Sequence, residues 1–377
     1  MSTKSVLKKV YIWFVRAFIV FSIAMLAILI ANKCGNNNQI DVIKVGVIAP
    51  LTGNQSRNAE MMMNGFKMAA EEDSISLVVE DSHDNPTTAV SAVLKLITRD
   101  KVVAILGDSR SAVTKSIADE TDKKNIILFS SISTADNLTD NVLFFRNVPK
   151  NELQAKSAYL FIKNNLQLTN VAIFNKNDDY GNDMSNRFKT NASNLNIVFN
   201  ESYANNRIDF RTSIKKIKSS GAEVIFAPSN YEETKNFIKQ AIEMSLNIPI
   251  IGGDDTDENL INVAKQYSGG YYYTTFIIDE NSSFYKSFYE KFKKRMGGEP
   301  QTYDAYAYEA AKILFEAIKQ SHSRKTKDVK FYLTNNTFKN SLTGEIEFDE
   351  HGNVKDRIFG LNQVTPNGIK QIELYDE

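Results

Sequence analysis

Residues 102–139, VVAILGDSRSAVTKSIADETDKKNIILFSSISTADNLT, contain the same pattern twice. Each copy opens with a short apolar run, at residues 102–106 and 126–129, of the kind that is buried in a parallel sheet. Small hydroxyl residues follow each run at once, and a helical pattern comes next. The stretch therefore predicts strand, turn and helix in succession, twice, with both turns at the same edge of one sheet.

Ser111 and Thr134 follow the two predicted strands. Open α/β sheets bind ligands at the carboxyl ends of their strands, and a Ser or Thr that opens a helix there offers a hydroxyl beside free backbone N–H groups. The pattern thus predicts that both residues hold an anion. Ser and Thr also cap helices in ordinary proteins, so a capping role alone is the alternative for each residue.

The length and charge of the chain limit the classes of function that it can have. A chain of 377 residues is too long for one typical domain and suits two lobes, each with a sizeable core. The 45 basic and 45 acidic residues give a net charge of zero, and the aromatic residues are not interleaved with basic clusters. We therefore expect no nucleic-acid partner.

The first 34 residues differ in kind from the rest. Basic residues precede an apolar run at residues 17–31, which is the shape of a secretory signal. Cys34, the only cysteine, is followed by a glycine and three asparagines, which looks like the lipidated cysteine and tether of a bacterial lipoprotein. We predict a signal, lipoprotein or membrane-anchor segment at residues 1–34 and a linker at 35–42.

The lipoprotein interpretation has an alternative. Lipoprotein processing sites carry small residues just before the cysteine, whereas Asn32 and Lys33 stand here. An uncleaved anchor would also fit, because residues 10–31 are apolar except for one arginine and one serine and could roughly span a bilayer. In either case the remaining chain is expected to be extracytoplasmic and anchored to the bacterial cell membrane.

The second half of the chain repeats the alternation of strands and helices. The apolar run at 171–174 precedes NDDYGNDM at 177–184, and the run at 249–252 ends in Gly253, Asp254 and Asp255. Two further stretches stand near the C-terminus, TYDAYAYEAAKILFEAI at 302–318 and SLTGEIEFDEHGNV at 341–354. The first predicts a helix and the second, with glycines as turn marks, a hairpin.

Taken in order, these stretches resemble the branched-chain amino-acid type of substrate-binding protein, the extracytoplasmic receptors of ABC importers with the type I periplasmic-binding fold. The resemblance covers nearly all of the chain from residue 43 onward. It implies an α/β fold of two doubly wound, Rossmann-like lobes joined by three crossing strands. The N-terminal lobe would comprise residues 43–148 plus 279–356, and the C-terminal lobe residues 149–278 plus 357–377.

The resemblance also implies roles for particular residues. Ser111 and Thr134 would grip a ligand carboxylate, Asp254 would pair with its ammonium, and Tyr180 and Tyr308 would flank the remainder. The alternatives are that Asp254 or its neighbour caps the helix near residue 258, and that the Tyr180 segment is an acidic loop before a helix. The other ligand-binding candidates are Arg110, Ile132 and Asn230.

The sequence departs from the family where specificity is set. Asn58 and Asn230 stand where branched-chain binders carry aromatic residues, and Arg110 stands where they carry a small or apolar one. If Arg110 points into the cleft, a purely aliphatic ligand is disfavoured, because an unpaired guanidinium would be costly to desolvate. The alternative is that Arg110 points outward.

We therefore predict a solute-binding protein that captures an amino acid or similar small polar solute and delivers it to an ABC transporter permease. The motifs GxGxxG, GxxxxGK[ST], GxSxG and HExxH are absent, so we expect neither an enzyme nor a cofactor. The three histidines stand apart in polar stretches, which disfavours a metal site. The alternatives are a ligand-sensing receptor domain that works with a separate signalling partner, and a binder of another solute such as an amide.

Overall fold

The computed structural model describes residues 11–26, 42–205, 207–339, 341–342 and 344–373. Residues 1–42 and residues 43–377 are two separate units. In the first unit, residues 11–26 form an exposed helix. No helix in the described ranges combines the length and the hydropathy needed to cross a membrane. Cys34, the predicted lipidation site, and residues 35–41 of the predicted linker lie outside the described residues.

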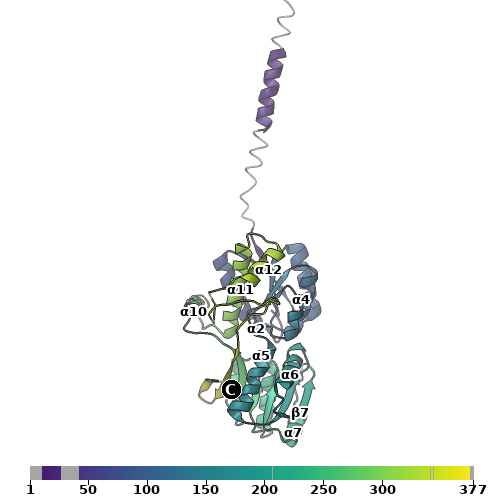
Figure 1. Cartoon of the computed structure of the whole chain (residues 1–377), viewed down its shortest axis with the longest axis vertical. Coiled ribbons are helices and arrows are strands. Elements are labelled where there is room, and N and C mark those ends of the chain that lie inside the picture. The colour runs from purple at the N-terminus through teal and green to yellow at the C-terminus, as the bar shows by residue number, and fades with distance from the viewer. Residues whose placement is uncertain (1–10, 27–41, 206, 340, 343, 374–377) are drawn as a thin grey trace, which may run out of the picture. The chain divides into compact units, whose positions relative to one another are not determined.

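The second unit contains two sheets, each within its own lobe (Figure 1). The first sheet has five parallel strands in the order β2-β1-β3-β4-β5. Its strands are β1 (Lys44–Ala49), β2 (Ser76–Asp81), β3 (Ala104–Gly107), β4 (Ile127–Ser130) and β5 (Phe144–Arg146). Because side chains alternate along a strand, Val47 and Leu106 pack on one face of this sheet while Ile48 and Ile105 pack on the other.

Helices cover both faces of the first sheet. These helices are α2 (Ser56–Asp73), α3 (Pro86–Lys95), α4 (Ser111–Lys123), α10 (Ser283–Met296), α11 (Thr302–Gln320) and α12 (Thr326–Asn335). Helices α3 and α4 share a core with one face, and the other four share a core with the opposite face. Helices α2 and α11 approach closely at Gly65, where a side chain would collide with the backbone of Asp304 and Tyr308.

The second sheet has seven strands in the order β12-β11-β10-β9-β8-β6-β7. Its strands are β6 (Asn170–Lys176), β7 (Asn196–Tyr203), β8 (Val224–Ala227), β9 (Ile250–Gly252), β10 (Tyr271–Phe276), β11 (Phe359–Thr365) and β12 (Gly368–Ile372). The pairs that join β10, β11 and β12 are antiparallel, and the other pairs are parallel. The antiparallel strands lie together at one edge of the sheet.

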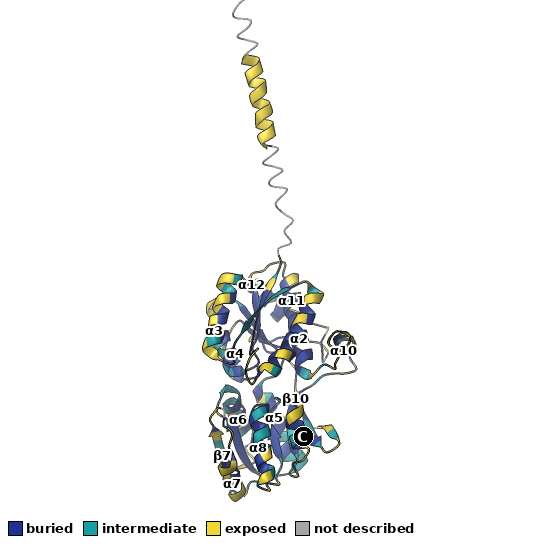
Figure 2. Cartoon of the chain, turned by 180° about the vertical axis from the view of Figure 1, so that it is seen from behind, coloured by how far each residue is buried: buried dark blue, intermediate teal, exposed yellow. Residues whose placement is uncertain are grey.

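Helices also cover both faces of the second sheet. They are α5 (Asn151–Leu160), α6 (Asp179–Asn191), α7 (Arg211–Ser219), α8 (Tyr231–Glu243) and α9 (Glu258–Ala264). Helices α5 and α6 share one core with the sheet, and α7, α8 and α9 share the other. The central strands β6, β8 and β9 are buried, whereas the edge strands β7 and β12 and the outer faces of the helices are largely exposed (Figure 2). Both lobes are thus doubly wound, as the sequence predicts.

The chain passes between the lobes three times: after β5, after β10 and just before β11. Buried polar bonds hold these passages together. Arg146 donates to Asn353 Oδ1 at 2.7 Å and to the carbonyl oxygen of Ala135 at 2.8 Å. Arg357 forms an ion pair with the buried carboxylate of Glu309 at 2.8 Å. The residues at which each lobe begins and ends, as expected from the sequence, stay a prediction.

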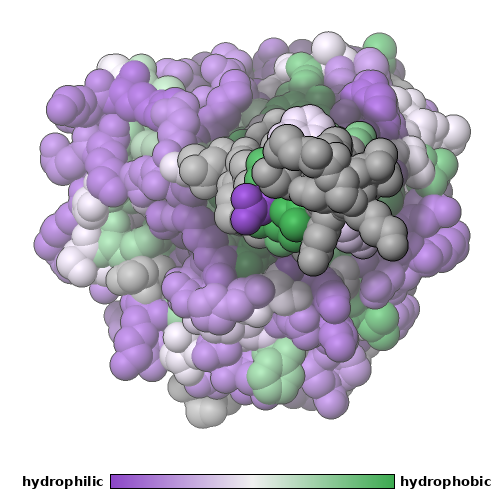
Figure 3. All heavy atoms as spheres, turned by 90° about the horizontal axis from the view of Figure 1, so that it is seen from above, coloured by the Kyte–Doolittle hydropathy of each residue, from purple (hydrophilic) through white to green (hydrophobic). Residues whose placement is uncertain are grey.

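One local prediction near the C-terminus was inaccurate. Residues 341–354 do not form a regular hairpin in the described part; single bridges join Phe338 to Ile346 and Phe348 to Val354. Strand β11 is followed by an antiparallel partner, β12, that the sequence analysis did not predict. The face of the molecule in Figure 3 is mostly hydrophilic, with apolar residues scattered over it, as is usual for a surface that contacts water.

Candidate functional site

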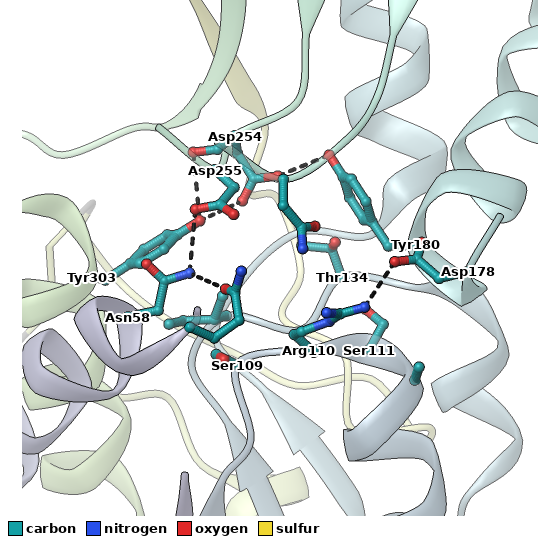
Figure 4. A pocket seen from close by; sticks show the side chains of 14 residues that line it. Asn58, Ser109, Arg110, Ser111, Thr134, Asp178, Tyr180, Asp254, Asp255 and Tyr303 are labelled. Atoms are coloured by element: carbon teal, nitrogen blue, oxygen red, sulfur yellow. Dashed lines mark hydrogen bonds and ion pairs between the residues drawn. The ribbon is translucent and has the colours of Figure 1, made fainter. Parts of the chain in front are cut away.

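A pocket of about 40 Å³ lies between the two lobes, at the carboxyl ends of the strands. Every lining residue comes from a segment that follows a strand or opens a helix. The first lobe contributes residues after β1, β3 and β4, and the second contributes residues after β6, β8 and β9. Tyr303, at the start of α11, completes the lining (Figure 4). The pocket is therefore at the place where doubly wound sheets bind ligands.

Ser111 and Thr134 line the first-lobe side of this pocket. Ser111 is the first residue of α4, whose N-cap position is Arg110, so capping does not account for the serine. The Ser111 hydroxyl accepts a hydrogen bond from the backbone N–H of Ala135 at 3.3 Å, which leaves its own proton to be donated. This hydroxyl and the N-terminal end of α4 suit an anionic group.

Asp254 lies on the second-lobe side and is held by neutral donors. Its Oδ1 accepts hydrogen bonds from Gln154 at 2.8 Å and from the Tyr180 hydroxyl at 3.1 Å, and its Oδ2 accepts one from the Tyr303 hydroxyl at 3.1 Å. Burial raises the pKa of the Asp254 carboxyl, against the effect of these donors. Among the described residues no basic side chain forms an ion pair with Asp254, so this carboxylate suits a ligand that brings a positive charge.

The capping alternative for Asp254 is wrong. Helix α9 is capped by Asp257, whose Oδ1 accepts the backbone N–H of Leu260 at 2.6 Å. At α6 each of the two alternatives, helix capping and pocket lining, holds for a different residue. Asp178 caps the helix by accepting the N–H of Gly181 at 2.9 Å, whereas Tyr180 lines the pocket and donates to Asp254.

Tyr308 does not lie in the pocket, which corrects the sequence prediction. Its hydroxyl donates to Glu72 at 2.7 Å, and its ring packs against Phe284 and Phe288 in the core of the first lobe. Tyr303 takes the expected place. The two tyrosines are five residues apart on α11, and five residues turn a helix by about 140° beyond one full turn, so they face different ways.

Arg110 lines the pocket, but its charge is already balanced by two acids. The guanidinium forms ion pairs with Asp84 at 2.8 Å, within its own lobe, and with Asp178 at 3.0 Å, across the cleft (Figure 4). Its side chain is 17% exposed. Arg110 therefore points inward, and it connects the two lobes. The pairing removes the cost that an isolated guanidinium would have in a closed cleft.

Further hydrogen bonds connect the lobes around the pocket. Asn58 Nδ2 donates to Asp255 Oδ1 at 3.2 Å, and the Tyr231 hydroxyl donates to the backbone oxygen of Asn54 at 2.7 Å. Arg57 donates to the backbone oxygen of Thr256 at 3.1 Å. These contacts hold the lobes together around a free volume of about 40 Å³, so separation of the lobes would widen the pocket for a solute.

The remaining candidates, Ile132 and Asn230, both line the pocket. Residues that the sequence analysis did not assign to the site also line it, namely Gln55, Ser109, Ala112, Asp178, Asp255 and Tyr303. Asp255 and Tyr303 had a local signal, since Asp255 follows a predicted strand and Tyr303 stands at the start of a predicted helix. Gln55 had no such signal, because its place in the pocket depends on how the two lobes meet.

The geometry has two chemically opposite ends. One end presents a hydroxyl and a helix N-terminus to an anion, and the other presents a carboxylate to a cation. The groups between them are tyrosine hydroxyls, carboxamides and the paired Arg110. The arrangement is complementary to a small zwitterion.

Comparisons with known proteins agree with the fold described above. Residues 42–368 match the family model described as "Periplasmic binding protein". An "Amino acid binding protein" of Pseudomonas aeruginosa is 26% identical over 353 residues, which cover 89% of this chain and 94% of that protein. A second P. aeruginosa protein, named for binding leucine, isoleucine, valine, threonine and alanine, is 24% identical over 87% of this chain and 91% of its own length.

The solved structures share the fold. The crystal structure of the leucine-binding protein LivK from Thermotoga maritima matches with a TM-score of 0.82 and 24% identity, and the match covers 88% of this chain and 98% of that one. The two lobes and their sheets are thus those of a known architecture.

Proposed function

Because this chain belongs to the periplasmic binding protein family, we propose that it captures an α-amino acid between its two lobes. Membership of this family implies that the binding unit works outside the cytoplasm. The names of the relatives, which refer to amino acids, support the proposed class of ligand.

One observation carries the proposal: Asp254 of the second lobe faces the same pocket as Ser111 and Thr134 of the first. The ligand carboxylate binds the two hydroxyl side chains and the N-terminal end of α4. The ammonium binds Asp254, whose orientation Tyr180, Tyr303 and Gln154 fix. Since each end of the ligand contacts a different lobe, binding favours closure.

Identification of the bound solute tests this proposal. The full chain is purified in detergent and immobilised, then unfolded with guanidinium so that the released small molecules can be identified by mass spectrometry. The chain is refolded and screened against the standard amino acids by thermal shift. We expect an amino acid to be released, and the same compound to raise the unfolding midpoint, since a ligand at 100 times its Kd stabilises by about 2.7 kcal/mol. A released solute without an amine, together with no response to any amino acid, would refute the proposal.

The bound amino acid is then delivered to an ABC transporter permease formed by other chains. Cells that lack this chain should lose high-affinity uptake of the labelled ligand. Intact uptake with loss of a cellular response to the ligand would instead identify the chain as the receptor of a separate signalling partner.

The N-terminal segment ties the binding unit to the membrane, and Cys34 is the proposed site of lipidation. A metabolic fatty-acid label should mark the wild-type chain and not a Cys34→Ser variant. Unlabelled chain that retains residues 1–33 would establish an uncleaved anchor in place of the lipid.

A further inference from the structure

The class of amino acid follows from the groups that surround the ligand's side chain, and this inference rests on the proposed function. Apart from the tyrosine rings, the apolar side chains in the described lining are Ile132 and Ala112. The other lining residues near Asp254 are carboxamides and a second carboxylate, namely Gln55, Asn58, Asn230 and Asp255. A branched aliphatic side chain would contact mostly polar groups here.

Asp255 is the first of two groups in the pocket that would gain a hydrogen-bond partner from the ligand. Its two oxygens accept one hydrogen bond each, from Asn58 Nδ2 at 3.2 Å and from the backbone N–H of Tyr231 at 3.2 Å. Both bonds are long and both donors are neutral. In the described part of the chain no basic group lies within 4.0 Å of this carboxylate. Burial raises the pKa of Asp255 to about 6, against the effect of the bond from Asn58 and of the Arg57 guanidinium.

Asn58 is the second such group. Its side chain is directed into the structure, with only 3% of the residue exposed, and its amide nitrogen donates to Gln55 and Asp255. Its Oδ1 is buried and accepts no hydrogen bond from the residues that the structure describes. A buried acceptor without a donor is destabilising, so a donor on the ligand would be favoured at this position.

Two of the basic groups around the pocket are paired with acids, whereas Arg57, which acts on Asp255, donates to Gln301 and to the backbone of Thr256. Arg110 is paired with Asp84 and Asp178, and Lys176 is paired with Glu233 at 2.7 Å. An acidic side chain on the ligand would meet two carboxylates in the lining, Asp254 and Asp255. This arrangement disfavours aspartate and glutamate as ligands.

We infer that the ligand is an amino acid with a short side chain that ends in a hydrogen-bond donor, an ammonium or a hydroxyl, which binds Asp255 and Oδ1 of Asn58. Asp255 and Asn58 are then the residues that set specificity, while Asp254 holds the α-ammonium common to all amino acids. The small free volume of the pocket favours a short side chain. A purely aliphatic side chain would leave both groups desolvated and unpaired.

Three compounds of nearly equal size test this inference: norvaline, homoserine and 2,4-diaminobutyrate, which end in a methyl, a hydroxyl and an ammonium group. The full chain in detergent is unfolded, freed of bound solute, refolded and titrated with each compound by calorimetry. We expect homoserine and diaminobutyrate to bind at least tenfold more tightly than norvaline. In an Asp255→Asn variant, diaminobutyrate should lose at least tenfold in affinity and norvaline less than threefold.

Glu258→Gln is the matched control, since Glu258 is an exposed acid three residues from Asp255. It should leave all three affinities unchanged. Norvaline that binds as tightly as both polar compounds would overturn the inference and leave the proposed function intact. Failure of these compounds and of all standard amino acids to bind would overturn the proposed function and the inference with it. The comparison of ligands uses the wild-type chain, so it stands even if Asp255→Asn does not fold.

Discussion

Tyr303 and Tyr308 provide an internal comparison, because they lie on one helix and only Tyr303 contacts Asp254. Removal of the Tyr303 hydroxyl takes away one of the donors that orient this carboxylate. A Tyr303→Phe variant should therefore bind the co-purifying amino acid up to about tenfold more weakly, because the lost hydroxyl acts on the ligand only through the carboxylate and so costs less than the roughly 1.5–3 kcal/mol of a direct hydrogen bond to a charged group. Isothermal titration calorimetry measures the change.

Tyr308→Phe is the control for this prediction. Its hydroxyl bonds to Glu72 within the first lobe, so the variant should keep the affinity of the wild type and lose only some stability. Equal weakening by the two variants would contradict the placement of Tyr303 in the site.

At the scale of single residues, only part of the site could be predicted from the sequence. Ser111, Thr134, Tyr180 and Asp254 could be proposed because each follows a predicted strand, and the structure does bring them to one pocket. Their roles toward a ligand stay predictions. The prediction that Tyr308 flanks the ligand was wrong, because a helical pattern predicts the helix but does not show which of its tyrosines faces the cleft.

Among the elements, the turn between β3 and α4 contains a buried acid, Asp108, which is 0% exposed. Its Oδ1 accepts the backbone N–H groups of Ser109 and Arg110 at 2.6 and 3.1 Å. Burial nevertheless raises the pKa of Asp108 from 3.8 to about 6. The folded protein therefore retains a proton on this group in a pH range where the unfolded chain has released it.

This retained proton makes stability depend on pH. A raised pKa contributes stability that is fully present below about pH 4 and is lost as the pH rises through about 6. Asp108→Asn keeps an acceptor for both N–H groups and does not titrate. The free energy of unfolding of the variant, relative to the wild type, should thus increase by roughly 1–3 kcal/mol between pH 4 and pH 7. Urea titrations followed by circular dichroism measure it, and a difference that does not vary with pH would contradict the buried titration.

The elements themselves were largely predictable, because buried parallel strands appear as short apolar runs such as residues 171–174 and 224–227. The alternation of strands and helices predicts doubly wound lobes, but it does not fix the order of the strands in each sheet. The segment at 341–354 was less predictable, since its glycines suit both a hairpin and the irregular path that the structure shows. Its conformation depends on packing against the first lobe, which no local pattern records.

For the whole molecule, the bonds across the cleft imply two states. Arg110 to Asp178 and Asn58 to Asp255 are contacts of a closed form, and both require the lobes to touch. We expect a solute to enter when these contacts open, so ligand-free protein should spend part of its time with the lobes apart. Small-angle X-ray scattering of residues 43–377 should give a smaller radius of gyration with saturating amino acid than without it. Identical scattering profiles would contradict closure by ligand.

The central claim is that Asp254 binds the ammonium of an amino acid, and a thermodynamic cycle tests it most directly. The wild-type chain and an Asp254→Asn variant are titrated by calorimetry with the co-purifying amino acid and with its N-acetyl derivative, which lacks the charge. A charge-assisted hydrogen bond contributes roughly 1.5–3 kcal/mol, so each change alone should weaken binding by about 10- to 150-fold. Because both changes remove the same contact, the two together should weaken binding little more than either alone. Full additivity of the two effects, or an Asp254→Asn variant that binds the amino acid as tightly as the wild type, would show that the ammonium binds elsewhere.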